Sequence, residues 1–310
     1  MPVPLLNCIP VIADSAPGCY NSGPEQIEAV ITPLTGAILF AHIGGEPADV
    51  EGIMAVAKKH NLPVVEDCAQ SHAAKVNGKY VGTFGDIAAF STMFGKHFCC
   101  GGQGGLVFTK REDLYWSIRR SADRGKPFGL PAGSTNCLGS LNFNMDELGA
   151  TMGRAQLKKL PMIVEKRRRV VEALKEGFRS LKSVSAPPQV SGAEPTYWFL
   201  RTRFHKEAVT CDKMTFCRAL TAEGLPVNPE YRAALPHTMD WFVNRRVFGD
   251  SQYPWSSPEY KGDAKRQFPC PNVNQSMDEH FHIQVHEGWS DKEVKDALAI
   301  LRKVEDAFSR

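Results

Sequence analysis

The sequence has almost no excess of charge of either sign. Its 310 residues include 37 Lys and Arg against 34 Asp and Glu, which leaves a net charge of +3. So small an excess does not indicate nucleic acid as a partner. The basic run from Lys166 to Arg169 lies in a helical pattern that predicts a solvated face. We therefore expect no nucleic-acid partner.

The sequence also lacks a charged leader and a long apolar run. Its first residues, MPVPLLNCIPVIAD, carry no positive charge before the apolar residues, and prolines interrupt them. A signal peptide needs the first feature, and a membrane span needs about 20 mainly apolar residues. We therefore expect a cytoplasmic protein with no membrane partner.

Disulfide and metal-site patterns are absent as well. None of the nine cysteines forms a CxxC pair, no His/Cys spacing fits a zinc site, and nine is an odd number. These features favour reduced thiols over a disulfide framework or a metal cluster. The sequence contains no internal repeat, and 310 residues are enough for two domains.

The first half of the chain alternates between strand and helix patterns. Apolar runs predict strands at Ala37–His42 and Leu62–Glu66, and helical spacing predicts a helix between them at Asp49–His60. This unit indicates an α/β fold with a parallel sheet. Ligands of such sheets gather beyond the carboxyl ends of the strands, where Asp67 lies.

Two further strands follow, and after them the pattern of predicted elements changes. Strands are predicted at Asp86–Ser91 and Gly105–Thr109, with Lys96 in the loop between them. Later predictions are a helix near Met145–Leu160, a long bridging helix from Pro161 to Leu181, a strand at Trp198–Phe204, a helix at Lys213–Glu223, an irregular binding or subunit-contact segment at Pro236–Met277, and a closing helix from Asp291. We expect a large domain at residues 1–160 and a smaller one at 161–310.

The segment from Val64 to Gly105 holds three residue types that suit one cofactor. Pyridoxal phosphate needs an amine to bond its aldehyde, an anion to keep its ring nitrogen protonated, and donors for its phosphate. Lys96, Asp67 and Ser91 supply these in turn. The alternative interpretations are a surface lysine, a helix-capping aspartate and a turn serine.

Three blocks resemble one known family. They are ITPLTGAILFAHIGGEPADVEGIMAVAKKHNLPVVEDCAQSHAA, GDIAAFSTMFGKHFCCGGQGG and LNFNMDELGATMGRAQLKKL, in that order. They resemble the pyridoxal-phosphate-dependent sugar aminotransferases of the DegT/DnrJ/EryC1/StrS group. The resemblance implies the α/β fold of PLP-dependent transferases, fold type I. Its central sheet is mostly parallel with helices on both faces, and a smaller α+β domain follows at the C-terminus.

The resemblance also implies site residues. Lys96 matches the lysine that holds the cofactor and acts as general base, and Asp67 matches the partner of the ring nitrogen. Gln70 matches the residue that bonds the ring hydroxyl, and Ser91 the serine that donates to the phosphate. Asn142 matches the asparagine that reaches a neighbouring subunit's phosphate, which implies a homodimer.

The implied activity is transfer of an amino group from glutamate or glutamine to a keto-sugar, often nucleotide-linked, or to a keto-cyclitol. The segment VNPEYR resembles the loop that enters the acceptor pocket, so Tyr231 is the predicted acceptor contact. Two residues after Asn142 the family usually has arginine, whereas this chain has Asn144.

Two departures leave alternatives open. The turn from Lys96 to Gly104 is one residue longer than usual, so that counting back from the glycines puts His97 at the lysine position. Histidine there is typical of a dehydratase branch that uses pyridoxamine phosphate. The large domain is also expected to be truncated at its N-terminus, without the turn that holds the phosphate. A non-catalytic binding protein of the same fold is therefore the third hypothesis.

Overall fold

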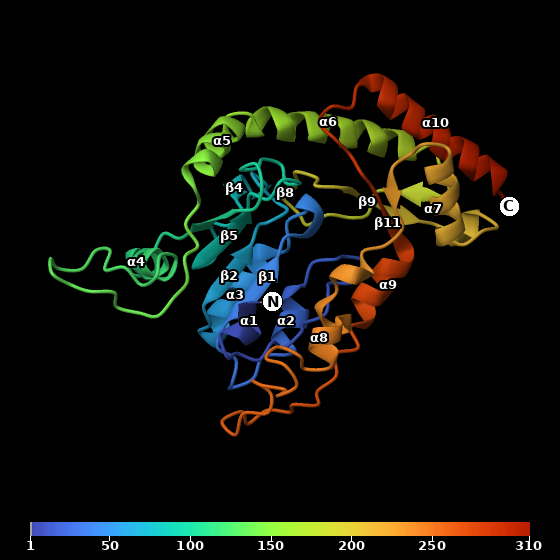
Figure 1. Ribbon diagram of the computed structural model, residues 1–310. Helices are drawn as coiled ribbons and strands as arrows, with labels where there is room; N and C mark the ends of the chain where they lie inside the picture. The colour runs from blue at the N-terminus through green and yellow to red at the C-terminus, as the bar shows by residue number, and fades with distance from the viewer. Residues whose placement is uncertain (1) are drawn as a thin grey trace.

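The structure is a computed structural model, and it describes residues 2–310 (Figure 1). Its helices are α1 (Pro2–Leu5), α2 (Pro24–Glu28), α3 (Val50–His60), α4 (Glu112–Ser121), α5 (Glu147–Leu157), α6 (Leu160–Phe178), α7 (Lys213–Ala222), α8 (Asp240–Val243), α9 (Pro271–Glu279) and α10 (Asp291–Ala307). Its strands are β1 (Ile38–Ala41), β2 (Val64–Asp67), β3 (Lys75–Val76), β4 (Lys79–Tyr80), β5 (Ile87–Ser91), β6 (Gly105–Phe108), β7 (Val184–Ser185), β8 (Ala193–Glu194), β9 (Leu200–Phe204), β10 (Val227–Asn228) and β11 (His280–Ile283).

The first half is built on a sheet of order β1-β2-β5-β6. Strands β1, β2 and β5 are parallel, and β6 returns antiparallel to β5, as the glycine-rich turn between them predicts. The register pairs Ala41 with Asp67 and Asp67 with Ala89. The carboxyl ends of three strands therefore meet at one edge, and the strand pairing predicted from the sequence is confirmed.

Helix α3 covers this sheet because one of its faces is apolar. Val50 and Ile53 are fully buried, and they pack with Val64 of β2 in the core of the first half. The Asp49 carboxylate accepts a hydrogen bond from the Gly52 N–H (3.0 Å), which caps the first turn. The helix ends at Asn61 in the left-handed conformation.

The second half is built on an antiparallel sheet of order β10-β11-β9-β7. Phe281 and Ile283 of β11 face a second core, which they share with residues of α6, α7 and α10. Pro161 lies in the first turn of α6, the position that proline favours. Figure 1 shows α6 running from α5 across the molecule, with α10 lying along it.

Some predictions from sequence patterns were wrong. The segment Pro236–Met277, expected to be irregular, contains α8 and most of α9. Helix α9 begins because the Asp14 carboxylate accepts hydrogen bonds from the N–H groups of Asn272 (2.8 Å) and Val273 (3.1 Å), and no local pattern reveals a cap so distant in sequence. Helix α4, which we did not predict, has no buried residue.

The predicted solvated face of the basic run was wrong for Arg167. This side chain is buried, and its guanidinium pairs with Glu287 (2.8 Å). It also donates to the carbonyls of Tyr197 (3.0 Å) and Trp198 (3.3 Å). Arg167 therefore ties α6 to the segment that enters the site described below.

A buried ion pair joins the two halves. Arg201 of β9 is 1% exposed and donates to the Glu46 carboxylate (2.9 Å) and to the Gly18 carbonyl (2.6 Å). Glu46 follows β1 and is also buried. Because both charges are removed from water, each depends on the other for compensation.

This pair generates a prediction about stability. Replacing Arg201 by alanine leaves the Glu46 carboxylate buried without its partner, so we expect a loss of about 3–5 kcal/mol in the free energy of unfolding. The control is Arg203→Ala on the same strand, whose side chain is half-exposed and should cost no more than about 1 kcal/mol. Urea denaturation measures both, and equal losses would contradict the role assigned to Arg201.

Candidate active site

Lys96 lies in a tight turn beyond the end of β5. Its backbone N–H donates to the Met93 carbonyl (3.0 Å), and the Cys100 N–H closes the turn on the Thr92 carbonyl (2.9 Å). The Lys96 side chain is half-buried. Burial lowers the pKa of its amine, and the negative charge of Asp67 opposes that shift. The structure therefore brings the predicted amine and the predicted anion within electrostatic range.

Trp198, which sequence reasoning missed, covers the lysine. The Lys96 ammonium lies 4.3 Å from the centre of the Trp198 ring, and the indole N–H donates to the Gly95 carbonyl (2.9 Å). The residues around Lys96 in the sequence could not reveal this contact, because Trp198 lies in the second half of the chain.

Two glycines allow Trp198 to approach. Gly44 (φ 69°) and Gly45 (φ 82°) follow β1, and their carbonyls accept from the N–H groups of Trp198 (2.8 Å) and Thr196 (2.9 Å). A Cβ atom on Gly45 would lie 2.5 Å from the Tyr197 nitrogen. Only glycine combines this backbone conformation with so close a contact.

Asp67 is the last residue of β2, and Gln70 lies three residues beyond it. One carboxylate oxygen of Asp67 accepts from the Ala69 N–H (2.9 Å), and the other has no hydrogen-bond partner among residues 2–310. Gln70 accepts from the Gly44 N–H (2.7 Å) and donates to the Tyr231 hydroxyl (2.8 Å). The structure thus joins Gln70 to Tyr231, the predicted acceptor contact from the second half.

Ser91 ends β5, next to the edge that carries Asp67. Its hydroxyl accepts a hydrogen bond from the Met93 N–H (3.3 Å), as in a turn serine, and keeps its own proton for another acceptor. Asn142 is exposed and lies between α4 and α5, whose connecting segment projects from the molecule in Figure 1. It pairs across a bridge with Asp123, and its side-chain oxygen accepts from Asn144. No described hydrogen bond joins it to the other predicted residues.

The donor set fits pyridoxal phosphate. A half-buried amine of lowered pKa, a carboxylate with a free oxygen and an amide lie around one sheet edge, with a hydroxyl at the next strand end. Lys96 would hold the aldehyde carbon, Asp67 the ring nitrogen, Gln70 the ring hydroxyl and Ser91 the phosphate.

His97 makes no described hydrogen bond to this set. It is 3% exposed, and its Nε2 donates to the Thr196 carbonyl (3.0 Å). Burial first, and then the charge of Arg167, lowers the pKa of His97 to about 3. The ring is therefore neutral, and its Nε2–H is used in a hydrogen bond between the two halves of the chain. This arrangement favours Lys96 over His97 as the reacting residue.

A cavity of about 440 Å³ adjoins the site. Its lining includes Trp198, which covers Lys96, and Tyr231, whose hydroxyl accepts a hydrogen bond from Gln70. Phe199, Asn228, His282 and Gln284 line the rest together with two apolar residues. Its size and its mixture of aromatic rings with a few polar groups are typical of small-molecule sites.

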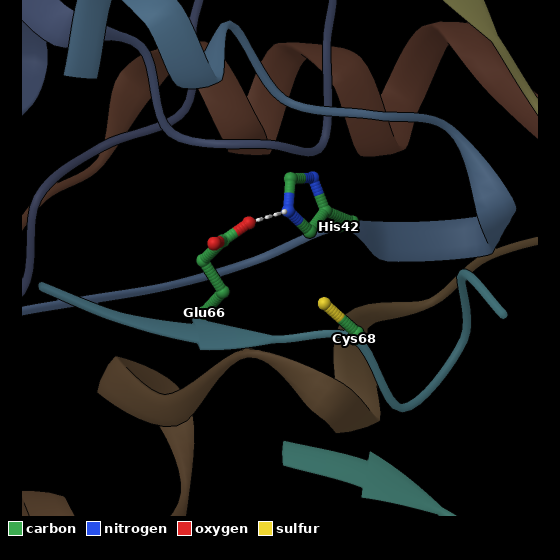
Figure 2. A group of neighbouring side chains, drawn as sticks. All are labelled: His42, Glu66 and Cys68. Carbon is green, nitrogen blue, oxygen red and sulfur yellow. Dashed lines mark hydrogen bonds and ion pairs between the residues drawn. The ribbon is translucent and has the colours of Figure 1, made fainter. Parts of the chain in front are cut away.

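A second cluster has the spacing of a metal site but another role. Figure 2 shows His42, Glu66 and Cys68 together, with their ligand atoms within 4.8 Å of one another. The Ala48 N–H donates to His42 Nδ1 (3.0 Å), so Nε2 carries the proton and donates to Glu66 (3.3 Å).

The Glu66 carboxylate accepts three further hydrogen bonds, from the N–H groups of Gly82 (2.7 Å), Phe84 (2.8 Å) and Gly85 (2.6 Å). Burial raises the pKa of Glu66, but these bonds outweigh it and the net shift is downward. Burial also raises the pKa of the Cys68 thiol. Because both oxygens and both ring nitrogens are in use, the cluster supports the turn behind Asp67 and leaves only the Cys68 thiol, whose raised pKa keeps it protonated, as a possible metal ligand.

Comparison with known proteins agrees with this geometry. The sequence profile described as the DegT/DnrJ/EryC1/StrS aminotransferase family matches residues 2–302. The chain belongs to the DegT/DnrJ/EryC1/StrS aminotransferase family. Within the described part, residues 2–310, no helix is long and apolar enough to cross a membrane.

Curated relatives carry names of sugar and cyclitol enzymes. GDP-perosamine synthase from Caulobacter vibrioides is 30% identical over 227 residues, which are 72% of this chain and 59% of that protein. L-glutamine:2-deoxy-scyllo-inosose aminotransferase from Streptoalloteichus tenebrarius is 32% identical over 255 residues, 78% of this chain and 59% of that one. The chain spans about half the length of the curated relatives it matches.

A solved structure of the family has the same fold. The aminotransferase from Psychrobacter cryohalolentis superposes with a TM-score of 0.80 at 26% identity, covering 97% of this chain and 76% of that one. This likeness confirms the predicted α/β fold of PLP-dependent transferases, fold type I.

The Glu66 cluster generates a second prediction. Glu66→Ala removes the acceptor of two buried donors, the Gly82 N–H and the His42 ring, and of two partly buried N–H groups. A buried donor costs about 1–3 kcal/mol when left unpaired, so we expect at least about 3 kcal/mol of lost stability. Exposed Glu165→Ala is the control and should change stability by less than about 0.5 kcal/mol. Added zinc should leave the melting temperature of the parent chain unchanged. A rise with zinc would instead identify a metal site.

Proposed function

We propose that this chain acts as a pyridoxal-phosphate-dependent aminotransferase. It would move an amino group from glutamate or glutamine to a keto-sugar, often nucleotide-linked, or to a keto-cyclitol. The observation that carries the proposal is the position of the Lys96 amine, which lies within the electrostatic influence of Asp67 and against Trp198, a residue that lines the cavity together with Tyr231. The names of the relatives support a sugar or cyclitol acceptor.

Bound pyridoxal phosphate supplies an aldehyde that takes up the amino group and a ring that accepts electron density from the donor's α-carbon. The chain supplies the proton transfers. Because burial lowers the pKa of Lys96, more of its amine is neutral near pH 7 than for a solvated lysine. The neutral Nζ accepts a proton and returns it, as a general base and then a general acid.

Asp67 and Trp198 serve the lysine and the cofactor in different ways. The free oxygen of Asp67 favours a protonated ring nitrogen, because a negative charge nearby stabilises the cationic form. The indole of Trp198 covers Lys96 and limits its access to water.

Contact with a second subunit belongs to the same proposal. Asn142 would reach the phosphate bound by a partner chain, and the enzyme would be a homodimer. Asn142 is exposed and bonded only locally among residues 2–310, so its side chain is accessible to another molecule.

The test is covalent capture of the cofactor. Borohydride treatment after addition of pyridoxal phosphate should fix one label per chain, and peptide mass mapping should place it on Lys96. Lys96→Ala should lose at least about 90% of the label, because a solvated lysine is mostly protonated at neutral pH. Lys79→Ala is a matched control, since Lys79 also lies over an aromatic ring, that of Phe84 (3.9 Å).

The same preparation separates the three hypotheses. An aminotransferase passes nitrogen from ¹⁵N-labelled glutamate or glutamine to the acceptor and needs Lys96. A dehydratase would retain activity in Lys96→Ala and lose it in His97→Asn. Absence of any label on the parent chain, with the fold intact, would favour the non-catalytic binding protein.

A further inference from the structure

One face of the second-half sheet opens into the cavity. Side chains alternate along a strand, so that Phe281 and Ile283 of β11 face the core while His282 and Gln284 face the other way. Asn228 of β10 pairs directly with His282 in the register and therefore shares this face. The Gln284 N–H donates to the Pro226 carbonyl (2.9 Å), which continues the ladder past the end of β11.

Among residues 2–310, no charged side chain lines this cavity. Burial, followed by the charge of Arg201, lowers the pKa of His282 to about 3, so the imidazole is neutral at pH 7. The cations that act on His282 are both engaged: Arg201 pairs with Glu46 (2.9 Å), and Lys213 donates to the His280 carbonyl (2.9 Å). An anionic group placed here would therefore lose water without gaining a counter-charge.

Two amides project into the cavity with unused hydrogen-bonding atoms. Gln284 is exposed and makes no side-chain hydrogen bond to any of residues 2–310. Asn228 accepts from the Glu230 N–H (3.2 Å), and its amide NH₂ has no partner within the described chain. An amide offers both donors and acceptors, as hydroxyl groups require.

Aromatic rings supply the apolar part of the same cavity. Phe199 stacks on His282, with 4.0 Å between ring centres and 11° between ring planes, and it also contacts Tyr231 edge to face (5.6 Å). Phe199 and His282 are 3% and 0% exposed, so this pair backs the cavity, whereas the half-buried rings of Trp198 and Tyr231 present aromatic surface to the C–H face of a saturated ring. Aromatic surface beside free amides suits a ring with many hydroxyl groups.

We propose that Asn228 and Gln284 are specificity-determining residues that bind the hydroxyl groups of an uncharged, polyhydroxylated ring in this cavity. The inference rests on the proposed function, because the ring would be the acceptor of the amino group. An acceptor that bears a phosphate or a carboxylate on the ring itself is excluded, whereas a charged group attached outside the cavity is not.

The experiment measures binding without chemistry. The probe is scyllo-inositol, a neutral polyol with no carbonyl group, titrated against the cofactor-loaded protein by saturation-transfer NMR. Asn228→Ala and Gln284→Ala should each weaken binding about fivefold, the effect of one lost neutral hydrogen bond. The control Gln275→Ala removes an exposed amide on α9 that pairs with Glu279 (2.7 Å), and it should leave binding unchanged.

A second probe tests the charge requirement. myo-Inositol 1-phosphate should bind at least about tenfold more weakly than scyllo-inositol, because none of the described lining residues is a cation. Equal binding of the two probes, an unchanged affinity in both alanine variants, or no binding of scyllo-inositol to the parent chain would each overturn the proposal. Failure of the proposed function has another signature, since Lys96 would then take up no label while scyllo-inositol still bound.

Discussion

The register of β2 between β1 and β5 is the constraint on which the site depends. Because Asp67 pairs with Ala41 on one side and Ala89 on the other, the three parallel strands end together. The turn after β5 then carries Lys96 back toward Asp67. A shift of one residue would turn Asp67 to the opposite face of the sheet and bring buried Glu66 to the site in its place. The four hydrogen bonds of the Glu66 carboxylate oppose such a shift.

The site is also a junction between the two halves of the chain. The carbonyls of Gly44 and Gly45 accept hydrogen bonds from the segment that carries Trp198, and Arg167 of α6 donates to the carbonyls of that segment. Gln70 meets Tyr231 from the other side. The buried pair of Arg201 and Glu46 lies on the same polar face of the second sheet as His282. The Arg201–Glu46 pair on this face thus stabilises the fold, while Asn228 and Gln284 on the same face line the cavity.

Much of this was predictable from the sequence, and the rest was not for identifiable reasons. Apolar runs and helical spacing located β1, α3, β2 and β5, which contribute buried residues to the structure, and the glycine-rich turn located β6, whose four residues are all exposed. Lys96, Asp67 and Ser91 were predicted as site residues because they lie within 30 residues of one another, and Gln70 was predicted from the family resemblance. Trp198, Phe199 and Gln284 were not, since long-range packing alone brings them to the cavity. Helix α9 was missed for a similar reason, because its cap is Asp14.

The central claim is that the Lys96 amine and the Asp67 carboxylate act on each other in the folded chain. The measurement is the pKa of Lys96, obtained from the pH dependence of its acylation by mass spectrometry, in the parent and in Asp67→Asn. The charge of Asp67 raises the pKa of Lys96 against the effect of burial, so its removal should lower that pKa further. Asp86→Asn, at the opposite end of β5, should leave it unchanged. An unchanged or higher pKa of Lys96 in Asp67→Asn would contradict the account.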